Sequence, residues 1–384
     1  MGWLEANVPP LEQLKRPKAS SADLQPWARD WQRRLFDAGW LVPGWPAELG
    51  GRDASPVEQM IYFEEMSRRE IPRSLNPQGL GIIAPSIRDY GTDAQREPFL
   101  LPTLRAEIGW CLGMSEPTAG SDLASLRTRA VRDGDEFVVN GQKVWTSGAH
   151  FSDWGMMLVR TNWDVPKHQG ITWIAVDMRS PGIEVRPLRQ ITGFAHFNEV
   201  FLTDVRIPAS NVLGDVDNGW RIAQTTLGNE RQMIGGGGSG VSFKSIAALA
   251  KASGRADDPL IRQELARSYT RFEILSWVGQ RAKARAQAGH APGPEMSIMK
   301  LAASQRVALD GDLGLMIEGA DGMLAGTDAP DDGTFQQLFL NQWSIRIGGG
   351  TEQIQRNVIG ERVLGLPGEP RPDKTEPFRT LPRN

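Results

Sequence analysis

A change in the spacing of apolar residues constrains the fold more than any other feature of this sequence. Near the N-terminus, apolar side chains recur at helical intervals, as at Trp27 and Trp31. From about residue 106 to residue 215 they alternate with polar residues in short runs separated by turns, which is typical of β-strands. The helical period returns after Asn218. We therefore predict an α+β chain with a helical domain (1–105), a mostly antiparallel β domain (106–215) and a second helical domain (216–384).

Capping and turn residues locate several elements within these regions. Ser55, Pro56 and Glu58 supply an N-cap, an N1 proline and a capping-box acid, and predict a helix that starts at residue 56. Asp133-Gly134 predicts a tight turn between two strands, and Asn140-Gly141 predicts another. Helical spacing in the C-terminal half predicts helices near 219–252, 259–288, 294–324, 333–346 and 351–364.

Composition argues against several classes of function. The 43 lysines and arginines nearly balance the 46 acidic residues, so the charge gives no indication of a nucleic-acid partner. Four widely spaced histidines and a single cysteine, Cys111, make a metal centre or a disulfide framework improbable and fit a reducing compartment. Neither a leader with an apolar core nor a run of about 18 apolar residues is visible. We expect a cytoplasmic protein without membrane insertion.

Two glycine-rich stretches raise the question of a ligand. GGGGSG (235–240) formally matches the GxGxxG phosphate-binding pattern, but the segment before it is not a strand and no βαβ unit surrounds it. Its glycines serve close helix packing, room for a ligand, or both. RIGGGTEQIQRN (346–357) places bare backbone before a predicted helix with Thr351 as N-cap. That helix would direct its free N–H groups at a cofactor.

Two polar segments of the β region carry the strongest indication of function. CLGMSEPTAGSD (111–122) is a glycine-containing turn after an apolar run, with the hydroxyls of Ser115, Thr118 and Ser121. NGQKVWTSG (140–148) adds Trp145 and Ser147 after a predicted turn. Alone, the first would be an ordinary loop and the tryptophan an ordinary core residue. Together, in this order and some twenty residues apart, they are informative.

The two segments resemble the acyl-CoA dehydrogenase family, whose β domain carries a T/S-E-P-x-x-G-S-D turn and a later N-G-x-K-x-W strand. The similarity covers nearly the whole chain, including the ending GGTEQIQRNVIGERVLG. It implies a central antiparallel β-barrel or sandwich between an N-terminal helical domain and a C-terminal four-helix bundle. It also implies FAD bound between the β domain and the C-terminal helices. The reaction would be α-proton abstraction from an acyl-CoA thioester with hydride transfer from the β-carbon to flavin N5.

The resemblance also assigns cofactor contacts to individual positions. Trp145 would pack on the isoalloxazine ring, and Ser147 would donate a hydrogen bond toward its N5 edge. Such fixed donors stabilise the charge of a reduced flavin without reorganisation. Ser121 would bind FAD or the pantetheine arm of the substrate. The remaining cofactor-binding positions are Leu112, Met114, Ser115, Thr351 and Gln353.

The sequence departs from the family at the catalytic base. Many members have a glutamate where this chain has Gly349, and abstraction of the α-proton needs a positioned base. In a subset that includes isovaleryl-CoA dehydrogenase, the base lies on an earlier helix, one residue before an arginine. That pattern matches Glu230-Arg231, which could otherwise be a structural ion pair. Gly349 keeps the N–H that polarises the thioester carbonyl in the family. Arg231, Gly237 and Ser121 are expected at the substrate, and Gly237 would leave room for a branched or bulky acyl chain.

Partners are also implied by the resemblance. Electrons would pass to an electron-transfer flavoprotein, and the chain would form a homo-oligomer (dimer or tetramer) or a heterotetramer with a related subunit. The cross-subunit motifs R-x-x-F-G and Q-x-x-G-G are poorly matched by KASGR (251–255) and MIEGADG (316–322), which leaves the adenine site open. Two alternatives remain: a non-catalytic partner subunit, and a flavin oxidase or monooxygenase on the same fold.

Overall fold

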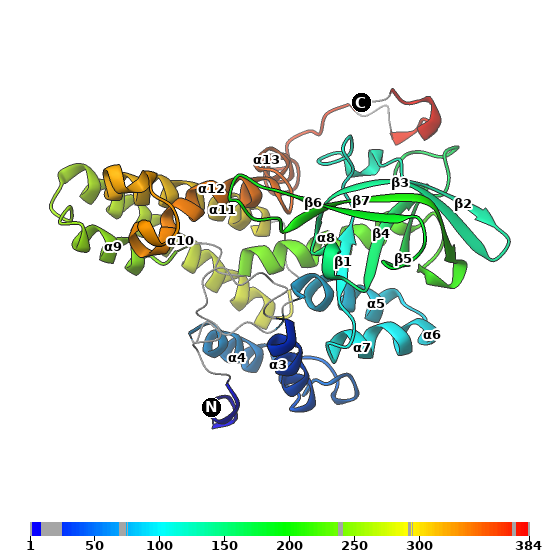
Figure 1. Cartoon of the computed structure of the whole chain (residues 1–384), viewed down its shortest axis with the longest axis horizontal. Helices are drawn as coiled ribbons and strands as arrows, with labels where there is room; N and C mark the ends of the chain where they lie inside the picture. Colours follow the sequence, from blue (N-terminus) through cyan, green and yellow to red (C-terminus); the bar gives the residue numbers. More distant parts are fainter. Residues whose placement is uncertain are drawn as a thin grey trace. The chain divides into compact units, whose positions relative to one another are not determined.

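The computed structural model describes residues 2–8, 25–68, 74, 76–236, 241–290, 293, 295–370 and 374–382. The chain forms two compact units, whose elements are labelled in Figure 1. Unit 1 contains residues 1–189, 195–229 and 371–384, and unit 2 contains residues 190–194 and 230–370.

Unit 1 starts with short helices and continues with strands. Its helices are α1 (Gly2–Asn7), α3 (Gln25–Asp37), α4 (Pro56–Arg68), α5 (Ala84–Tyr90), α6 (Asp93–Gln95) and α7 (Leu101–Leu104). Its strands are β1 (Trp110–Gly113), β2 (Arg129–Asp133), β3 (Glu136–Ser147), β4 (Trp154–Arg160), β5 (Ile171–Asp177), β6 (Ile183–Leu188), β7 (Phe197–Pro208) and β8 (Val212–Leu213). The predicted capping box is confirmed, because the Glu58 carboxylate accepts from the Ser55 N–H at 2.8 Å and Ser55 Oγ accepts from the Glu58 N–H.

The strands form one sheet with the order β6-β7-β3-β2-β4-β5-β8, as Figure 1 shows for the long pair β3 and β7. Most neighbours are antiparallel, but β1 pairs with β4 in parallel, and β2 touches β4 in parallel. The sheet is therefore mixed but mostly antiparallel, which confirms the predicted mostly antiparallel domain and adds two parallel pairings to it. Since β1 enters directly from the helical region and is separated from β4 by the β2–β3 hairpin, no tight turn forces these two strands to be antiparallel.

The side chains of β4 pack into a core on each face of the sheet, so the middle of the sheet is buried on both faces. Met156 and Leu158 pack into a core with the N-terminal helices, where Trp31 and Ile83 also lie. Met157 and Val159 point to the opposite face and pack with residues of β3 and β7. Alternate residues of one strand thus serve two cores, as the two-residue period of a strand requires.

One predicted turn is not a turn. Gly134 adopts a φ of +64° in the expected hairpin turn between β2 and β3. Asn140-Gly141, in contrast, lies inside β3, where the register with β7 shifts between Val139 and Gly141. A Cβ at Gly141 would come within 2.7 Å of the Cα of Thr128, so this glycine allows a close approach of backbones within a β-bulge rather than a chain reversal.

Unit 2 is helical. Helix α8 (Gly219–Gly236) begins in unit 1 and ends in unit 2, and it is followed by α9 (Phe243–Ala252), α10 (Pro259–Gln287), α11 (Glu295–Glu318), α12 (Thr334–Ile347) and α13 (Glu352–Val358). The single helix predicted at 219–252 is wrong, because Ser242 accepts from the Ser245 N–H and caps a new helix. The helix predicted at 294–324 ends at Glu318, and Gly319 has a φ of +64°. Over the described ranges, no helix is both long and apolar enough to cross a bilayer.

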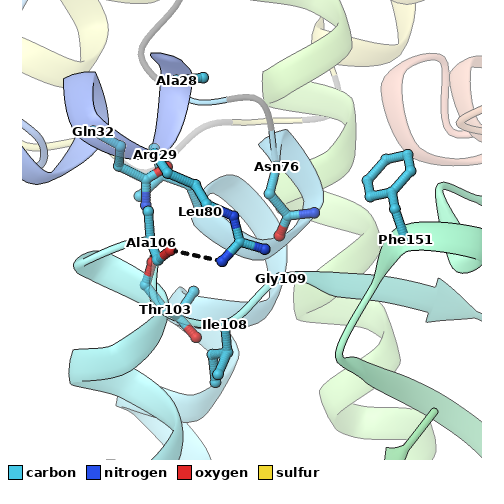
Figure 2. A pocket seen from close by; sticks show the side chains of 10 residues that line it. All are labelled: Ala28, Arg29, Gln32, Asn76, Leu80, Thr103, Ala106, Ile108, Gly109 and Phe151. Atoms are coloured by element: carbon cyan, nitrogen blue, oxygen red, sulfur yellow. Dashed lines mark hydrogen bonds between the residues drawn. The ribbon is translucent and has the colours of Figure 1, made fainter. Parts of the chain in front are cut away.

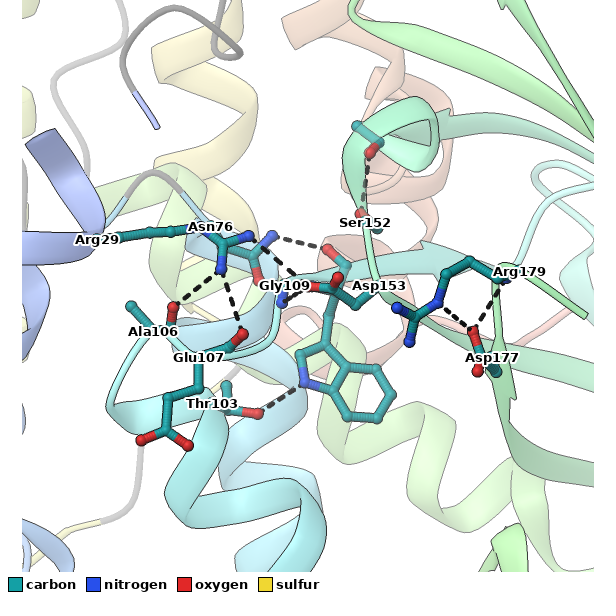
Figure 3. A network of polar contacts seen from close by, with 12 residues as sticks. Arg29, Asn76, Thr103, Ala106, Glu107, Gly109, Ser152, Asp153, Asp177 and Arg179 are labelled. Atoms are coloured by element: carbon teal, nitrogen blue, oxygen red, sulfur yellow. Dashed lines mark hydrogen bonds and ion pairs between the residues drawn. The ribbon is translucent and has the colours of Figure 1, made fainter. Parts of the chain in front are cut away.

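A side-chain network holds the start of β1 against the helices of unit 1 (Figure 3). Asn76 acts as a strand partner, because its amide accepts from the Trp110 N–H at 3.0 Å and donates to the Trp110 carbonyl at 2.7 Å. Arg29 donates to the carbonyls of Ala106 and Glu107, both at 3.2 Å. Asp153 accepts from the Gly109 N–H at 2.8 Å. β1 is thereby fixed at its first residue.

The side chains of Arg29 and Asn76 border a small cavity, with Phe151 on the far side in Figure 2. Its volume is about 40 Å³, enough for about one water molecule. The cavity is therefore too small for a cofactor or a substrate, and its role is structural.

Replacing Asn76 with alanine should lower the free energy of unfolding by about 2 kcal/mol, because both backbone groups of the buried Trp110 lose their partner. Asn211→Ala is the matched control, since Asn211 makes one hydrogen bond, to the Ala175 carbonyl at 3.1 Å. Urea denaturation followed by tryptophan fluorescence measures both. Equal losses for the two variants would contradict the role assigned to Asn76.

Candidate functional site

Strand β1 and the turn after it contain four of the residues proposed from the sequence. Leu112, in β1, and Met114 and Ser115, directly after it, are half-buried, and Ser121 is exposed. A Cβ at Gly120 would meet nothing within 4 Å, so this part of the turn faces open space. Within the described residues, the N–H groups of Gly120 and Ser121 have no hydrogen-bond partner. The turn therefore presents unused donors to a ligand.

A buried ion pair joins this turn to β3. Lys143 Nζ lies 2.8 Å from Glu116 Oε1 and donates to the Met114 carbonyl at 3.2 Å. The Glu116 carboxylate also accepts from the N–H groups of Arg127 (2.6 Å) and Thr128 (2.8 Å). The two sequence motifs are thus connected through one carboxylate and one ammonium group, each almost inaccessible to water.

Burial and mutual attraction shift the pKa values of both members of this pair. Burial by itself raises the pKa of Glu116, but the charge of Lys143 and the hydrogen bonds to the carboxylate outweigh it and hold the pKa below its usual range. Burial lowers the pKa of Lys143, and the attraction to Glu116 offsets only part of that effect. Neither group is placed for proton transfer, since both are enclosed. The pair positions the turn.

Trp145 lies in a second bulge of β3 and has an unusual backbone. Its φ is +59°, and the register with β7 shifts between Lys143 and Thr146. A bulky residue with positive φ is rare and costs about 1–3 kcal/mol. The indole is 59% exposed and touches Phe197 edge-on at 5.8 Å. A strained backbone that exposes a large flat apolar side chain is typical of a ligand surface.

Hydrogen bonds between the end of β3 and residues at or just before the start of β7 hold this bulge in place. Buried Asn198 donates to the Thr146 carbonyl at 2.9 Å, and the Gly148 N–H donates to the His196 carbonyl at 3.0 Å. Ser147 ends β3 and is half-buried, and its hydroxyl has no partner within the described part of the chain. Ser147 is therefore available to donate to a ligand next to Trp145.

In unit 2, side-chain hydrogen bonds to its carbonyl groups hold the glycine turn of RIGGGTEQIQRN in place. Gln355 Nε2 donates to the carbonyls of Gly349 (3.1 Å) and Gly350 (3.3 Å), and buried Lys300 donates to the Gly350 carbonyl at 2.8 Å. Gly349 and Gly350 have φ values of +65° and +92°, in the region that disfavours side chains. No acceptor among the described residues pairs with their N–H groups. The turn thus anchors its oxygens and leaves its amides free.

Thr351, Glu352 and Gln353 follow this turn and have three different roles. Thr351 caps α13, because its hydroxyl accepts from the Ile354 N–H at 3.2 Å, which confirms the predicted N-cap. Gln353 is exposed on α13 and is free to reach a ligand. Glu352 is buried and pairs with Arg346 at 2.8 Å, which ties α13 to the end of α12.

Two of the proposed site residues lie on α8. Glu230 and Arg231 are within this helix, as expected, but their side chains lie outside the described part of the structure. Gly237 lies outside the described residues altogether.

The exposed side chains and unpaired donors of the candidate site fit a flavin nucleotide better than a metal. An exposed indole suits a planar ring system, and free backbone amides with a neighbouring hydroxyl suit its heteroatoms and phosphates. No cluster of three or more histidine, cysteine, aspartate or glutamate side chains occurs in the described ranges. Burial raises the pKa of Cys111 to about 12, so its thiol stays protonated and is not a nucleophile.

Comparison with known proteins identifies the family. Residues 11–107, 111–205 and 217–364 match the N-terminal, middle and C-terminal domain models of acyl-CoA dehydrogenases. The chain therefore belongs to the acyl-CoA dehydrogenase family, a class of flavin-dependent oxidoreductases. The resemblance inferred from the two sequence motifs is confirmed.

Several relatives are similar over most of their length. The chain is 40% identical to the acyl-CoA dehydrogenase IpdE1 of Mycobacterium tuberculosis, over 89% of this chain and 88% of that protein. It is also similar to the solved Tcur3481-Tcur3483 steroid ACAD, with a TM-score of 0.80, 29% identity and coverage of 92% and 99%. The ChsE4-ChsE5 complex from Mycobacterium tuberculosis has a TM-score of 0.74, 28% identity and coverage of 92% and 100%.

Sequence reasoning missed the residues that hold the site in place. Glu116 and Lys143 both lie inside the quoted motifs, and an acid and a base at such positions could have suggested an ion pair. Gln355 lies two residues after the predicted Gln353 and supports the glycine turn from within α13. Lys300 lies on α11, about 50 residues away in sequence, and nothing local connects it to the turn.

Replacing Lys143 with methionine should destabilise the protein by about 3–5 kcal/mol, because the Glu116 carboxylate is left buried without its counter-charge. The double variant Lys143→Met with Glu116→Gln should recover at least half of this loss, since no isolated charge remains. Arg186→Met, which breaks the exposed pair with Glu184, is the control and should change little. Urea denaturation measures all three, and a double variant no more stable than Lys143→Met would argue against a buried charge pair.

Proposed function

We propose that this chain is an FAD-dependent acyl-CoA dehydrogenase that introduces an α,β-double bond into a CoA thioester, with Glu230 as the catalytic base. The three regions 1–105, 106–215 and 216–384 would act as its domains. The observation that carries the proposal is the turn at Gly349. Among the described residues, the N–H groups of Gly349 and Gly350 have no acceptor, and Gly349 itself has no carboxylate. Since the family reaction needs a base, the base would come from another element.

The proposed cofactor residues come from the β1 turn, the β3 bulge and the segment after the glycine turn. Bound FAD would supply the hydride acceptor. Trp145 would cover the ring system and exclude water, and Ser147 would donate to its edge. Leu112, Met114 and Ser115 would line the ring, and Ser121 would bind the cofactor or the pantetheine arm. Thr351 and Gln353 would bind the nucleotide part.

The proposed proton chemistry belongs to residues of unit 2. The Gly349 N–H would donate to the thioester carbonyl oxygen and make the α-proton more acidic. Glu230 would accept that proton, and Arg231 would orient the carboxylate or support its packing. The left-handed φ of Gly349 supports this division of roles, because a side chain at this position would cost about 1–2 kcal/mol.

The acyl group is proposed to be branched, cyclic or polycyclic. Gly237, which has no side chain, would leave space for such a group. A similar solved protein is described as a steroid ACAD, which agrees with a bulky substrate. Electrons would leave through an electron-transfer flavoprotein, the acceptor expected for this family.

Glu230→Gln should keep its flavin but lose about 10²–10⁴-fold in the rate of flavin bleaching by acyl-CoA, because the base for the α-proton is gone. Anaerobic stopped-flow absorbance would measure it, with the best substrate chosen first from branched, cyclic and steroid-side-chain CoA esters. Glu264→Gln, on α10 and paired with Arg267, is the control and should bleach normally. Unchanged bleaching in Glu230→Gln would refute the assignment. Peroxide formed without an electron acceptor would instead favour an oxidase.

Helix α10 has a large exposed apolar surface. Of its described side chains only Ile261 and Ser268 are buried, although the helix has 29 residues. Large apolar residues remain exposed on more than one side: Leu260, Tyr269, Phe272, Ile274 and Trp277. Such a surface is typical of an interface. We propose a dimer or tetramer of this chain, or a heterotetramer with a related subunit, as the name of the ChsE4-ChsE5 complex indicates for that protein.

Trp277→Arg should dissociate the assembly, because a charge replaces a 57% exposed apolar ring in the proposed interface. Size-exclusion chromatography with light scattering measures the mass before and after the change. The control is Ile191→Arg, which introduces the same charge at a 67% exposed apolar site outside α10. Trp163→Arg is not a suitable control, because it would disturb folding. A wild-type monomer without flavin would indicate a half-site subunit that needs a different chain.

A further inference from the structure

The C-terminal segment 374–382 packs against the β4–β5 loop and the last residue of β4 in unit 1. It belongs to the same compact unit, and its turn is drawn in red in Figure 1. The Phe378 N–H donates to the Val165 carbonyl at 2.9 Å, and the Arg379 N–H donates to the Trp163 carbonyl at 3.0 Å. The Phe378 side chain is 1% exposed. A segment near the chain end thus contributes a fully buried ring to another part of the fold.

Phe378 is buried against two guanidinium groups. Its ring centre lies 3.9 Å from the guanidinium carbon of Arg160 and 4.8 Å from that of Arg127. Trp163 packs on it at 5.3 Å. An aromatic face in contact with a cation that is shielded from water is a strong form of this interaction. The ring therefore covers Arg160 and excludes water from it.

The Arg160 side chain also binds the backbone of residues 121–126, the Ser121–Leu126 turn, which includes Ser121 of the candidate site. Its guanidinium donates to the carbonyls of Ala124 (2.6 Å) and Lys167 (2.7 Å), and it lies 3.4 Å from the Leu126 carbonyl. Lys167 donates to both carboxylate oxygens of Asp122, at 2.8 and 2.9 Å. Burial lowers the pKa of Arg160 to about 10, so it remains a cation at neutral pH.

We propose that segment 374–382 is a strap, and that Phe378 is a positioning residue that fixes the Ser121–Leu126 turn through Arg160. Without the ring, water would compete for the guanidinium donors, and the carbonyls that close the turn would be held less firmly. The turn would then bind its ligand less tightly. Only this last step rests on the proposed function, because it takes Ser121 to contact FAD or the pantetheine arm.

Amide hydrogen exchange of the apoprotein tests the strap directly. In Phe378→Ala, exchange of the hydrogen-bonded amides of residues 125–128 should speed up about tenfold or more, while α11 stays unchanged. Phe378→Leu fills the space without a ring face and should restore only part of the protection, whereas Phe378→Tyr should restore most of it. The adjacent change Arg379→Ala removes an exposed ion pair to Asp164 and is the matched control. The leucine and tyrosine variants keep the site filled, so the comparison does not depend on the alanine variant folding.

Flavin titration of the same apoproteins tests the consequence for the site. Phe378→Ala should weaken FAD binding about tenfold, while kcat at saturating FAD stays within about twofold of the wild type. Faster exchange of 374–382 alone, with the turn unchanged, would overturn the proposal, as would unaltered FAD affinity. Failure of the proposed function would appear instead as normal bleaching in Glu230→Gln, and the hydrogen-exchange result for the strap does not depend on that outcome.

Discussion

The organisation of the β region depends on one buried ion pair, between Glu116 and Lys143. Two charges taken out of water are costly unless each is paired and hydrogen-bonded. Here the carboxylate accepts from Lys143 and from two backbone N–H groups, and the ammonium also binds the Met114 carbonyl. These requirements leave the turn after β1 and the middle of β3 in one relative arrangement. The open side of the turn and the strained Trp145 bulge are consequences of that arrangement.

The same principle recurs in the glycine turn of unit 2, with backbone carbonyls as the anchored groups. Lys300 and Gln355 hold the oxygens of this turn, and both side chains are buried. The Gly349 carbonyl shares its peptide group with the Gly350 N–H, so holding that oxygen directs this N–H away from the contacts. Two rigid sets of unused donors result, one in each unit. Fixed donors of this kind suit an enzyme that stabilises developing charge without rearranging.

Some features were predictable from the sequence because their causes are local. The capping box at Ser55 and Glu58, the N-cap at Thr351 and the hairpin turn at Gly134 depend on a few neighbouring residues, and all three are confirmed. The break at Ser242 was missed because a helix-like apolar spacing continues on both sides of it. Asn140-Gly141 was assigned to a turn because the same dipeptide serves turns and bulges, and only the partner strand distinguishes the two.

The sequence by itself determined the order of helical and β regions, the two motifs of the β region and hence the family. It also determined that Gly349 carries no base, because a missing carboxylate is visible without coordinates. Only the tertiary structure decided which groups hold these motifs in place. Lys143 meets Glu116, Lys300 meets the Gly350 carbonyl and Phe378 covers Arg160 across separations of 27 to 218 residues. Contacts of that range arise from packing of the whole chain, and no local spacing of residues encodes them.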